Sequence, residues 1–474
     1  MLDDVLSRLK VVKDSVVDGT GTLIDDASRI IDRASNKNIC IGVTGFSGSG
    51  KSTFITSLLH QLRYSNEAGI SGFQLARDER ILEVNLLPLA GCELFDYEQG
   101  ITALASQPPK WPMPTGGLTG CVIQIIYKRD SVASSVIGDS STFNIEIRDY
   151  PGEWLLDLPL RDINYWTWSL ENIELIQQAP RKIIMGDLLQ QLQSINPFEI
   201  LNEDRIESLF KLYSEYLKEC KQQGLTLIQP GRVLLPDPNQ PVVPFFPLLR
   251  LRQYDQATLE GASEQSIYKV MLSRYDLYVS DIVKPFYDDY FNKIDRQVVM
   301  VDVLKGLSGG ELNFDDMMVA LSRIMDCYRH GTNSLFEKLM SPKVERILFL
   351  ASKPDRVLAS QHENLRSLVN DIIVRVCSQK LRNAIHFDTE AACAVRCTNE
   401  KHDKLRVTAE DGERGVITPP DIPEHIPTHD EWLEMKVWQP VILQPPFVPG
   451  LQQGARLPSI RMDNVLKYLI GDKF

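Results

Sequence analysis

Residues 41–54 read IGVTGFSGSGKSTF and contain the pattern G-x-x-x-x-G-K-S. The apolar run at residues 38–43 predicts a buried strand before this pattern, and apolar side chains at helical spacing over residues 52–62 predict a helix after it. In this context the glycines let backbone N–H groups point at phosphate oxygens, and the helix N-terminus adds a partial positive charge. The sequence therefore predicts a phosphate-binding loop formed by Gly45, Phe46, Ser47, Gly48, Ser49, Gly50, Lys51, Ser52 and Thr53.

Two side chains of this loop have expected roles in nucleotide binding. Lys51 is expected to reach the β- and γ-phosphates, and the Ser52 hydroxyl is expected to bind Mg²⁺. The loop does not choose between ATP and GTP, because SGSGKS also occurs in P-loop kinases that act on small molecules. Other motifs must separate a kinase from a GTPase.

A second motif follows a predicted strand at residues 142–149, where Asp149 is followed three residues later by Gly152. D-x-x-G is typical of GTPases, in which the carboxylate holds Mg²⁺ and the glycine N–H contacts the γ-phosphate. The sequence Asp-Tyr-Pro-Gly is also common in ordinary turns, so this motif alone leaves a turn open.

The next residue, Glu153, stands where GTPases often carry a glutamine that orients the attacking water. We expect Gly152 and Glu153 to act in hydrolysis, at a slow rate because a carboxylate repels a triphosphate. A solvent-facing Glu153 is the alternative. A catalytic arginine could come from a helical insertion or from the loop that holds Arg77 and Arg80.

A third motif lies much later in the chain, where an apolar strand runs into Ser352-Lys-Pro-Asp355. This resembles [NT]-K-x-D, in which one carboxylate accepts hydrogen bonds from two guanine N–H groups while the lysine stem lies along the base. Adenine would leave a buried carboxylate unpaired, so Lys353 and Asp355 predict guanine specificity. Ser352 is shorter than asparagine, so the bridge to the phosphate loop that asparagine usually makes is not expected from it.

The order of the elements predicts the fold. A strand at residues 296–304, a helix at residues 365–376 and a strand at residues 390–397 complete an alternation of strands and helices. Such alternation implies an α/β fold with a doubly wound, mostly parallel sheet that binds its ligand at the carboxyl ends of the strands. The last of these strands would place three residues against guanine O6: Ala394, Val395 and Arg396.

GTPases carry a threonine that senses Mg²⁺ and the γ-phosphate, and two positions in this sequence fit it. It should precede the strand at residues 121–127, and both Thr115 and Thr119 qualify. We favour Thr115 because it lies in a loop flanked by proline and glycine, whereas Thr119 is close enough to the strand to belong to it. The predicted metal ligands are therefore Ser52, Asp149 and Thr115, with Thr119 as the alternative.

Together, GFSGSGKS, DYPGEWLLDLPL and SKPD resemble the YcjX family of bacterial stress-inducible GTPases, and the resemblance runs through nearly the whole chain. It implies a Ras-like P-loop GTPase core carrying an extra helical domain. It also implies a role in the phage-shock response to envelope stress.

An insertion has independent support from chain length. Roughly 140 residues separate Trp154 from the strand at residue 296, far more than an ordinary connection needs. Helical patterns at residues 203–224 and 263–289 flank a proline-rich loop at residues 231–247, which is either a packed connector or a lip of the binding site. The expected divisions are 1–36 (N-terminal helical segment), 37–155 (first part of the core), 156–295 (helical insertion) and 296–474 (second part of the core).

Composition excludes several classes of protein. The 474 residues carry a net charge of −12 without any basic run, so nucleic acid is not an expected partner. Neither a signal peptide nor a stretch of transmembrane length is evident, so we expect a cytoplasmic protein.

The amphipathic residues 2–33 are expected to pack on the core rather than on a membrane, and the eight cysteines are expected to be free thiols. His425 and His429 do not predict zinc, because nearby prolines prevent the helix that would bring them together.

The motifs favour a GTP-driven switch that binds GTP or GDP with Mg²⁺, hydrolyses GTP and acts on a protein effector that the sequence does not identify. The alternatives are a P-loop small-molecule kinase, which would need an acceptor site and phosphate-clamping arginines, and a scaffold with a vestigial nucleotide site.

Overall fold

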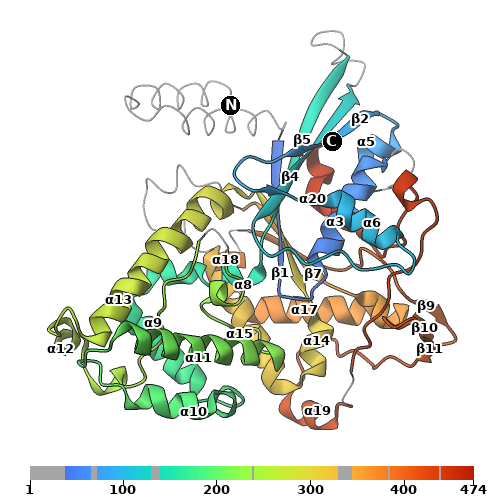
Figure 1. Cartoon of the computed structure of the whole chain (residues 1–474). Coiled ribbons are helices and arrows are strands. Elements are labelled where there is room, and N and C mark those ends of the chain that lie inside the picture. The colour runs from blue at the N-terminus through green and yellow to red at the C-terminus, as the bar shows by residue number, and fades with distance from the viewer. Residues whose placement is uncertain are drawn as a thin grey trace, which may run out of the picture.

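The computed structural model describes residues 38–65, 72–129, 139–237, 240–328, 344–382, 385–436 and 439–473, so the predicted N-terminal helical segment lies outside the described residues. One mixed sheet organises these residues, with the strand order β2-β4-β5-β1-β6-β7-β8 and β3 paired with β4 (Figure 1). Its strands are β1 (Asn38–Gly45), β2 (Ile81–Pro88), β3 (Glu93–Leu94), β4 (Thr119–Lys128), β5 (Ser140–Asp149), β6 (Arg296–Val301), β7 (Arg346–Ala351) and β8 (His386–Ala391).

The sheet is mainly parallel. β1 pairs in parallel with β5 on one side and β6 on the other, and β7 and β8 continue the parallel order. β4 runs antiparallel to both β2 and β5, which forms a long ribbon at one edge. The prediction of an α/β fold with a mostly parallel sheet is confirmed.

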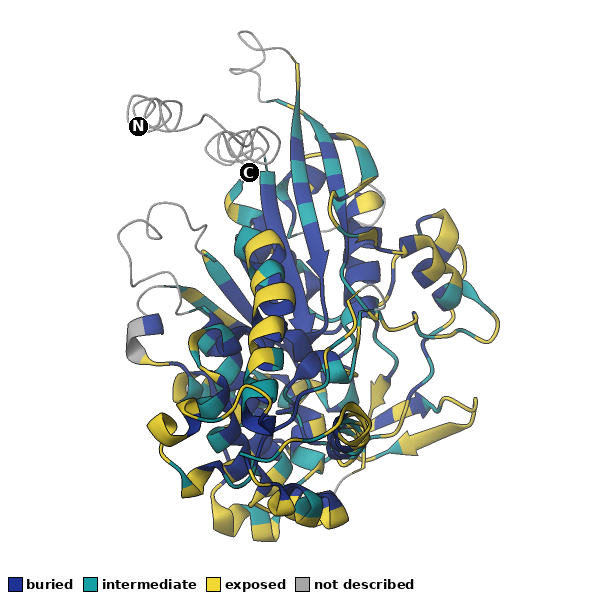
Figure 2. Ribbon diagram, turned by 60° about the vertical axis from the view of Figure 1, so that its left-hand side comes forward, coloured by how far each residue is buried: buried dark blue, intermediate teal, exposed yellow. Residues whose placement is uncertain are grey.

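Helices cover both faces of the sheet because its central strands are apolar on both sides. In β6, Val298 and Met300 pack with α3 (Lys51–Arg63), α6 (Tyr97–Ala105) and α20 (Met462–Ile470). Val299 and Val301, one residue out of phase, pack with α15 (Glu311–Cys327) and α17 (His362–Val376) on the other face. Figure 2 shows the resulting buried strands between helices whose outer faces are exposed.

Residues between β5 and β6 form mostly helices, which gather on one side of the sheet (Figure 1). The helix predicted at residues 203–224 is α11, which begins after Asn202, whose side chain accepts the Arg205 N–H at 2.9 Å. The α-helices of this segment are α8 (Gly152–Leu155), α9 (Tyr165–Ile176), α10 (Arg181–Ser194), α11 (Glu203–Gln222), α12 (Gln256–Glu260) and α13 (Ile267–Tyr278).

The helix predicted at residues 263–289 is less regular than its sequence pattern indicates. After α13 the chain continues as two π-helical turns, η4 (Val279–Val283) and η5 (Phe286–Tyr290). The proline-rich loop at residues 231–247 begins with a single 3₁₀ turn, η2 (Gly231–Val233). Phe245 and Phe246 of this loop are fully buried in the helical core, as a packed connector requires.

Two strand predictions at the carboxyl edge of the sheet need correction. β6 ends at Val301 because the Asp302 side chain accepts the Lys305 N–H and begins α14 (Val303–Ser308). The strand expected at residues 390–397 is β8 and ends at Ala391. Beyond it the backbone pairs with the C-terminal segment instead, since the Cys393 N–H donates to Ile460 O at 3.0 Å and the Arg396 N–H to Pro458 O at 2.6 Å.

The remaining elements are smaller. A three-stranded antiparallel sheet follows β8, and short helices lie around the core. They are β9 (Asn399–Lys401), β10 (Lys404–Thr408), β11 (Arg414–Ile417), α5 (Gln74–Arg77), α18 (Gln379–Arg382) and α19 (His429–Glu434). In the described part of the chain we find no helix with the length and apolar character needed to cross a bilayer.

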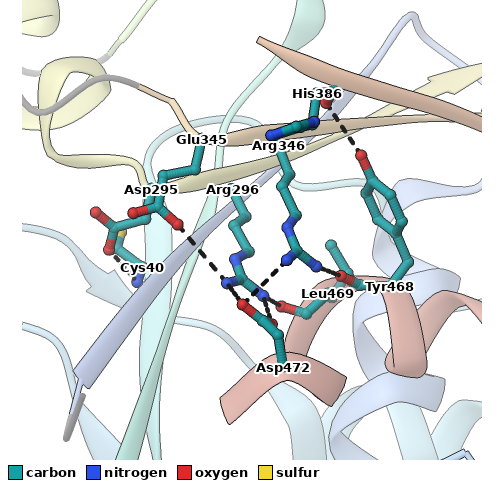
Figure 3. Close-up of polar contacts among 9 residues, drawn as sticks. All are labelled: Cys40, Asp295, Arg296, Glu345, Arg346, His386, Tyr468, Leu469 and Asp472. Atoms are coloured by element: carbon teal, nitrogen blue, oxygen red, sulfur yellow. Dashed lines mark hydrogen bonds and ion pairs between the residues drawn. The ribbon is translucent and has the colours of Figure 1, made fainter.

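The C-terminal end closes the sheet at the amino ends of β6 and β7 (Figure 3). Arg296 is fully buried and donates to both carboxylate oxygens of Asp472, each at 2.6 Å. Arg346 approaches the same carboxylate at 3.1 Å, and Glu345 lies 3.7 Å from Arg296. A buried guanidinium therefore depends on Asp472, the second residue of the last 3₁₀ turn, η10 (Gly471–Lys473). This ion pair lies at the opposite edge of the sheet from the carboxyl ends of the strands.

Candidate functional site

The predicted phosphate loop connects β1 to α3 as expected. Gly50, which precedes the helix, has φ +93° and Gly48 has φ +83°, backbone conformations that favour glycine. The Ser49 N–H donates to Phe46 O at 3.0 Å and closes the turn. The N-terminus of α3 is therefore presented at the carboxyl ends of the parallel strands, where an anion can be bound.

A cavity of about 320 Å³ lies at this edge of the sheet, a size suited to a small ligand. Segments far apart in sequence line it: the phosphate loop, residues 111–115, the D-x-x-G segment, residues 352–356 and residues 392–397. The predicted residues that line it are Gly45, Phe46, Ser47, Gly48, Ser49, Gly50, Lys51, Ser52, Thr53, Thr115, Glu153, Lys353, Asp355, Ala394 and Val395.

The predicted metal ligands come together around the buried Asp149 carboxylate. Lys51 Nζ lies 2.7 Å from Asp149 Oδ1. Thr115 Oγ1 donates to Asp149 Oδ2 at 2.5 Å and lies 3.2 Å from Ser52 Oγ. Thr119, the first residue of β4, also donates to Asp149 Oδ2, at 3.2 Å. Two hydroxyls and a carboxylate within hydrogen-bond reach are hard oxygen donors of the kind that Mg²⁺ prefers, so the residues fit that ion.

Gly152 packs directly on the phosphate loop. A Cβ atom at this position would lie 2.7 Å from Gly45 O and 2.8 Å from Gly45 C, both of them backbone atoms. Only glycine fits this approach without displacing one of the two segments. The D-x-x-G backbone is thereby held against the loop that is predicted to bind phosphate.

Glu153 is buried and bonded on two sides. Its Oε1 accepts the Ser47 N–H of the phosphate loop at 3.3 Å and lies 3.1 Å from Lys221 Nζ of α11. With 5% of its surface exposed, Glu153 does not face solvent, so that alternative is wrong. The carboxylate is stable there because a cation and a backbone N–H replace the water that it loses.

At the other end of the cavity, Lys353 makes the bridge that the shorter Ser352 does not make. Lys353 Nζ donates to Gly48 O and to Asp302 Oδ2, each at 2.5 Å. Ser352 instead donates to Val301 O, from its N–H at 3.0 Å and its hydroxyl at 3.4 Å. The lysine ties the predicted base-recognition loop to the phosphate loop.

Asp355 is 5% exposed and lines the cavity. One oxygen, Oδ2, accepts the Cys397 N–H at 2.9 Å, and the Asp355 carbonyl accepts the Thr398 hydroxyl. Burial, together with the nearby Asp355 carboxylate, raises the pKa of the Cys393 and Cys397 thiols well above the ordinary value, so both remain neutral. The two loops at this end of the cavity are thus fixed to each other.

Of the three residues expected to contact guanine O6, only two line the cavity. Ala394 and Val395 line the cavity, but Arg396 does not: its N–H is bonded to Pro458 O and its Nε donates to Thr398 O at 3.0 Å. The prediction of Arg396 is wrong because the strand was expected to end at residue 397, whereas β8 ends six residues earlier, at Ala391. Residues that line the cavity here without having been predicted are Ala392, Cys393 and Cys397.

Other cavity residues had no sequence signal that could have found them. Trp111 and Leu235 line the cavity, and Leu235 comes from the proline-rich loop, which thus touches the rim as well as the core. The Trp111 indole N–H donates to Leu443 O at 2.7 Å. Asp302 and Lys221 reach the site through Lys353 and Glu153.

Three weaker predictions can also be placed. Arg80 donates to Lys128 O at the far end of β4 and Arg77 lies beside Asp78, so neither lines the cavity. His425 and His429 pair with different glutamates, and no cluster of three or more metal-binding side chains occurs among the described residues. All eight cysteines are free thiols, as predicted.

Comparison with known proteins decides the family. The profile of the YcjX-like family, DUF463, matches residues 39–474, which include every motif described above. The chain belongs to this family. Two relatives named "Ras-like GTPase YcjX" are similar along almost their whole length. The Escherichia coli (strain K12) protein is 31% identical over 469 residues, covering 95% of this chain and 99% of the relative. The Shewanella oneidensis (strain MR-1) protein is 30% identical over 475 residues, covering 94% and 96%.

The mainly parallel sheet of this YcjX-like protein is consistent with the Ras-like description of its relatives. Because the alignments cover both halves of the chain, they include the phosphate loop, the D-x-x-G segment and the SKPD loop.

Proposed function

We propose that this YcjX-like protein is a molecular switch that binds GTP and GDP with Mg²⁺ and slowly hydrolyses GTP. One observation carries the proposal: a single cavity is lined by Lys51, Ser52 and Thr115 at one end and by Lys353 and Asp355 at the other. The buried Asp149 carboxylate contacts Lys51 and Thr115 directly behind the first group. The names of the two relatives support the same reading.

In this proposal each residue of the site has a separate role in binding or hydrolysis. The phosphate-loop N–H groups and Lys51 bind the β- and γ-phosphates, while Ser52, Thr115 and Asp149 hold Mg²⁺, Asp149 through its water shell. The ion, when bound, neutralises charge on the β- and γ-phosphate oxygens. Gly152 offers its N–H to the γ-phosphate, and Glu153 orients the attacking water.

Guanine specificity rests on Asp355. Its carboxylate is buried, and a base that cannot donate two hydrogen bonds would leave it with the Cys397 N–H as its side-chain donor among the described contacts. Ala394, Val395 and Lys353 line the cavity. In the proposal the first two offer backbone N–H groups to the base oxygen, and the Lys353 stem lies along the base.

We expect fluorescent GDP bound to the purified protein to be displaced by GDP and GTP roughly 100-fold more effectively than by ATP, because only guanine satisfies Asp355. Asp355→Asn should shift this preference to xanthine nucleotides, since an amide can donate to the xanthine 2-oxygen. The measurement is competition monitored by fluorescence anisotropy with Mg²⁺ present. Equal displacement by ATP would favour a P-loop kinase instead.

The two threonines are predicted to differ in their effect on Mg²⁺. Thr115→Ala should weaken binding of the non-hydrolysable analogue β,γ-imido-GTP by about tenfold and increase its Mg²⁺ requirement, because Thr115 meets both Ser52 and Asp149. Thr119→Ala should have a smaller effect, since Thr119 is anchored in β4 and reaches Asp149 alone. Titrations at several Mg²⁺ concentrations test this, and equal effects of both variants would contradict it.

Three finer parts of the proposal depend on the family resemblance. We propose that residues 156–295 act as an inserted helical domain between the two parts of the core, 37–155 and 296–474. We also propose that the protein acts in the cytoplasm during envelope stress and that a protein effector or activator responds to its nucleotide state.

A further inference from the structure

One carboxylate oxygen at the phosphate end of the cavity has two donors from different parts of the chain. Glu153 Oε1 accepts the Ser47 N–H from the phosphate loop at 3.3 Å and lies 3.1 Å from Lys221 Nζ in the last turn of α11. The Glu153 side chain is 7% exposed and that of Lys221 28%. An anionic oxygen held by a phosphate-loop N–H and an ammonium group has the surroundings of a phosphate oxygen.

Glu153 and a γ-phosphate cannot both keep this position. Ser47 belongs to the loop predicted to bind the phosphates, and Glu153 follows Gly152, whose backbone touches that loop. A triphosphate brings its own negative oxygens to the same N–H group, and a buried carboxylate beside it would be repelled strongly. GDP has no γ-phosphate and leaves the Glu153 contact undisturbed.

Lys221 can form an ion pair either with the Glu153 carboxylate or with a γ-phosphate. Among the described residues, Glu153 is the acid with which Lys221 forms an ion pair. Its long side chain comes from a helix C-terminus, where a cation is also favoured by the helix dipole. Because one oxygen, Glu153 Oε1, contacts both the Ser47 N–H and Lys221 Nζ, an anion that replaced this oxygen would meet the same ammonium group.

The surroundings of Glu153 connect this exchange to the helical segment. A Cβ atom at Gly231 would lie 2.1 Å from Glu153 O, so this loop packs directly on the Glu153 backbone. The Gly231 N–H donates to Asp157 at 2.9 Å, and the Tyr278 hydroxyl donates to Asp157 at 2.6 Å. A displacement of the Glu153 backbone would therefore press on η2, which Asp157 joins to Tyr278 of α13.

We propose that Lys221 is the γ-phosphate sensor of this protein: it pairs with Glu153 when GDP is bound and with the γ-phosphate when GTP is bound, coupling α11 to the nucleotide state. The proposal rests on the proposed function, and it identifies a positioning and binding residue that lies in the helical segment. It assigns Glu153 a second role, as an internal substitute for the γ-phosphate.

Affinities of GDP and β,γ-imido-GTP for Lys221→Met test the proposal. We expect the analogue to bind about tenfold more weakly than to the wild type, the effect of losing one charge-assisted hydrogen bond, with GDP affinity unchanged within about twofold. Lys221→Arg should restore most of the loss. Lys218→Met is the matched control, because Lys218 is an exposed lysine on the same helix, and it should leave both affinities unchanged.

A double-mutant cycle separates direct contact from an indirect effect through Glu153. Glu153→Gln should strengthen analogue binding by removing the competing carboxylate. In that background Lys221→Met should still weaken the analogue about tenfold if Lys221 touches the γ-phosphate. No further loss in the Glu153→Gln background, or an equal loss for GDP and the analogue, would overturn the sensor role. Failure of the wild type to bind either nucleotide would instead overturn the proposed function.

Discussion

Gly152→Ala is expected to reduce GTP hydrolysis by roughly 100-fold or more while leaving GDP affinity nearly unchanged. The added Cβ would lie 2.7 Å from Gly45 O and 2.8 Å from Gly45 C. Backbone atoms cannot rotate away as a side chain can, so the D-x-x-G segment must separate from the phosphate loop. The Gly152 N–H then loses its position for the γ-phosphate, which GDP does not have.

Single-turnover hydrolysis and equilibrium GDP binding, measured on the same preparation, check this prediction. Gly415→Ala is a suitable control, because Gly415 lies in β11 and its added Cβ would make only an ordinary contact, 3.9 Å from Val407. Hydrolysis at the wild-type rate in Gly152→Ala would show that the close approach has no part in turnover. A parallel loss of GDP binding would show damage to the phosphate loop itself.

The second large effect concerns stability. Asp472→Asn is expected to lower the free energy of unfolding by about 3 kcal/mol, because it leaves the fully buried Arg296 without its main counter-charge. The loss should stay at the lower end of the range for broken buried pairs, since Glu345 remains 3.7 Å from Arg296. Urea unfolding measures the difference, with the exposed Asp421→Asn as a control that should change little.

The same ion pair predicts a dependence of stability on pH. Burial alone would raise the pKa of Asp472, but the hydrogen bonds and charge of Arg296, helped by Arg346, outweigh it and lower that pKa below its usual value. The unfolded chain therefore binds the proton more readily than the folded one. The stabilisation is complete above the ordinary aspartate pKa and is lost as the pH falls through the lower, folded pKa. Asp472→Asn should remove this acid-dependent component, and an unchanged pH profile would contradict the assignment.

Much of the fold could be predicted because its signals are local. The strand, glycine-rich loop and helix at residues 38–63 are adjacent in sequence, so the strand and the helix on either side of the predicted phosphate loop could be located from local patterns. The strand that ends at Asp149 and the one that precedes Ser352 were likewise marked by apolar patterns and by the motifs that follow them. Strand ends were predicted poorly where the deciding partner is distant, as at Cys393, which pairs with Ile460.

In the site, too, local sequence predicts the candidate residues, whereas distant contacts decide their surroundings. Sequence patterns left Thr115 and Thr119 as alternatives, and both prove to donate to one oxygen of Asp149, with Thr115 alone also close to Ser52. Glu153 could be read from its motif, but its burial could not, since that depends on packing by the helical segment.

The sequence by itself determined the class of fold and the motifs from which phosphate and guanine binding are predicted, because each depends on neighbours within a few positions. Only the tertiary structure decided that Lys221 lies against Glu153, that Asp302 holds Lys353 and that Asp472 neutralises Arg296. These pairs join residues 68, 51 and 176 positions apart, and no local pattern specifies them. Their contacts exist because the folded chain buries charges that must find a partner.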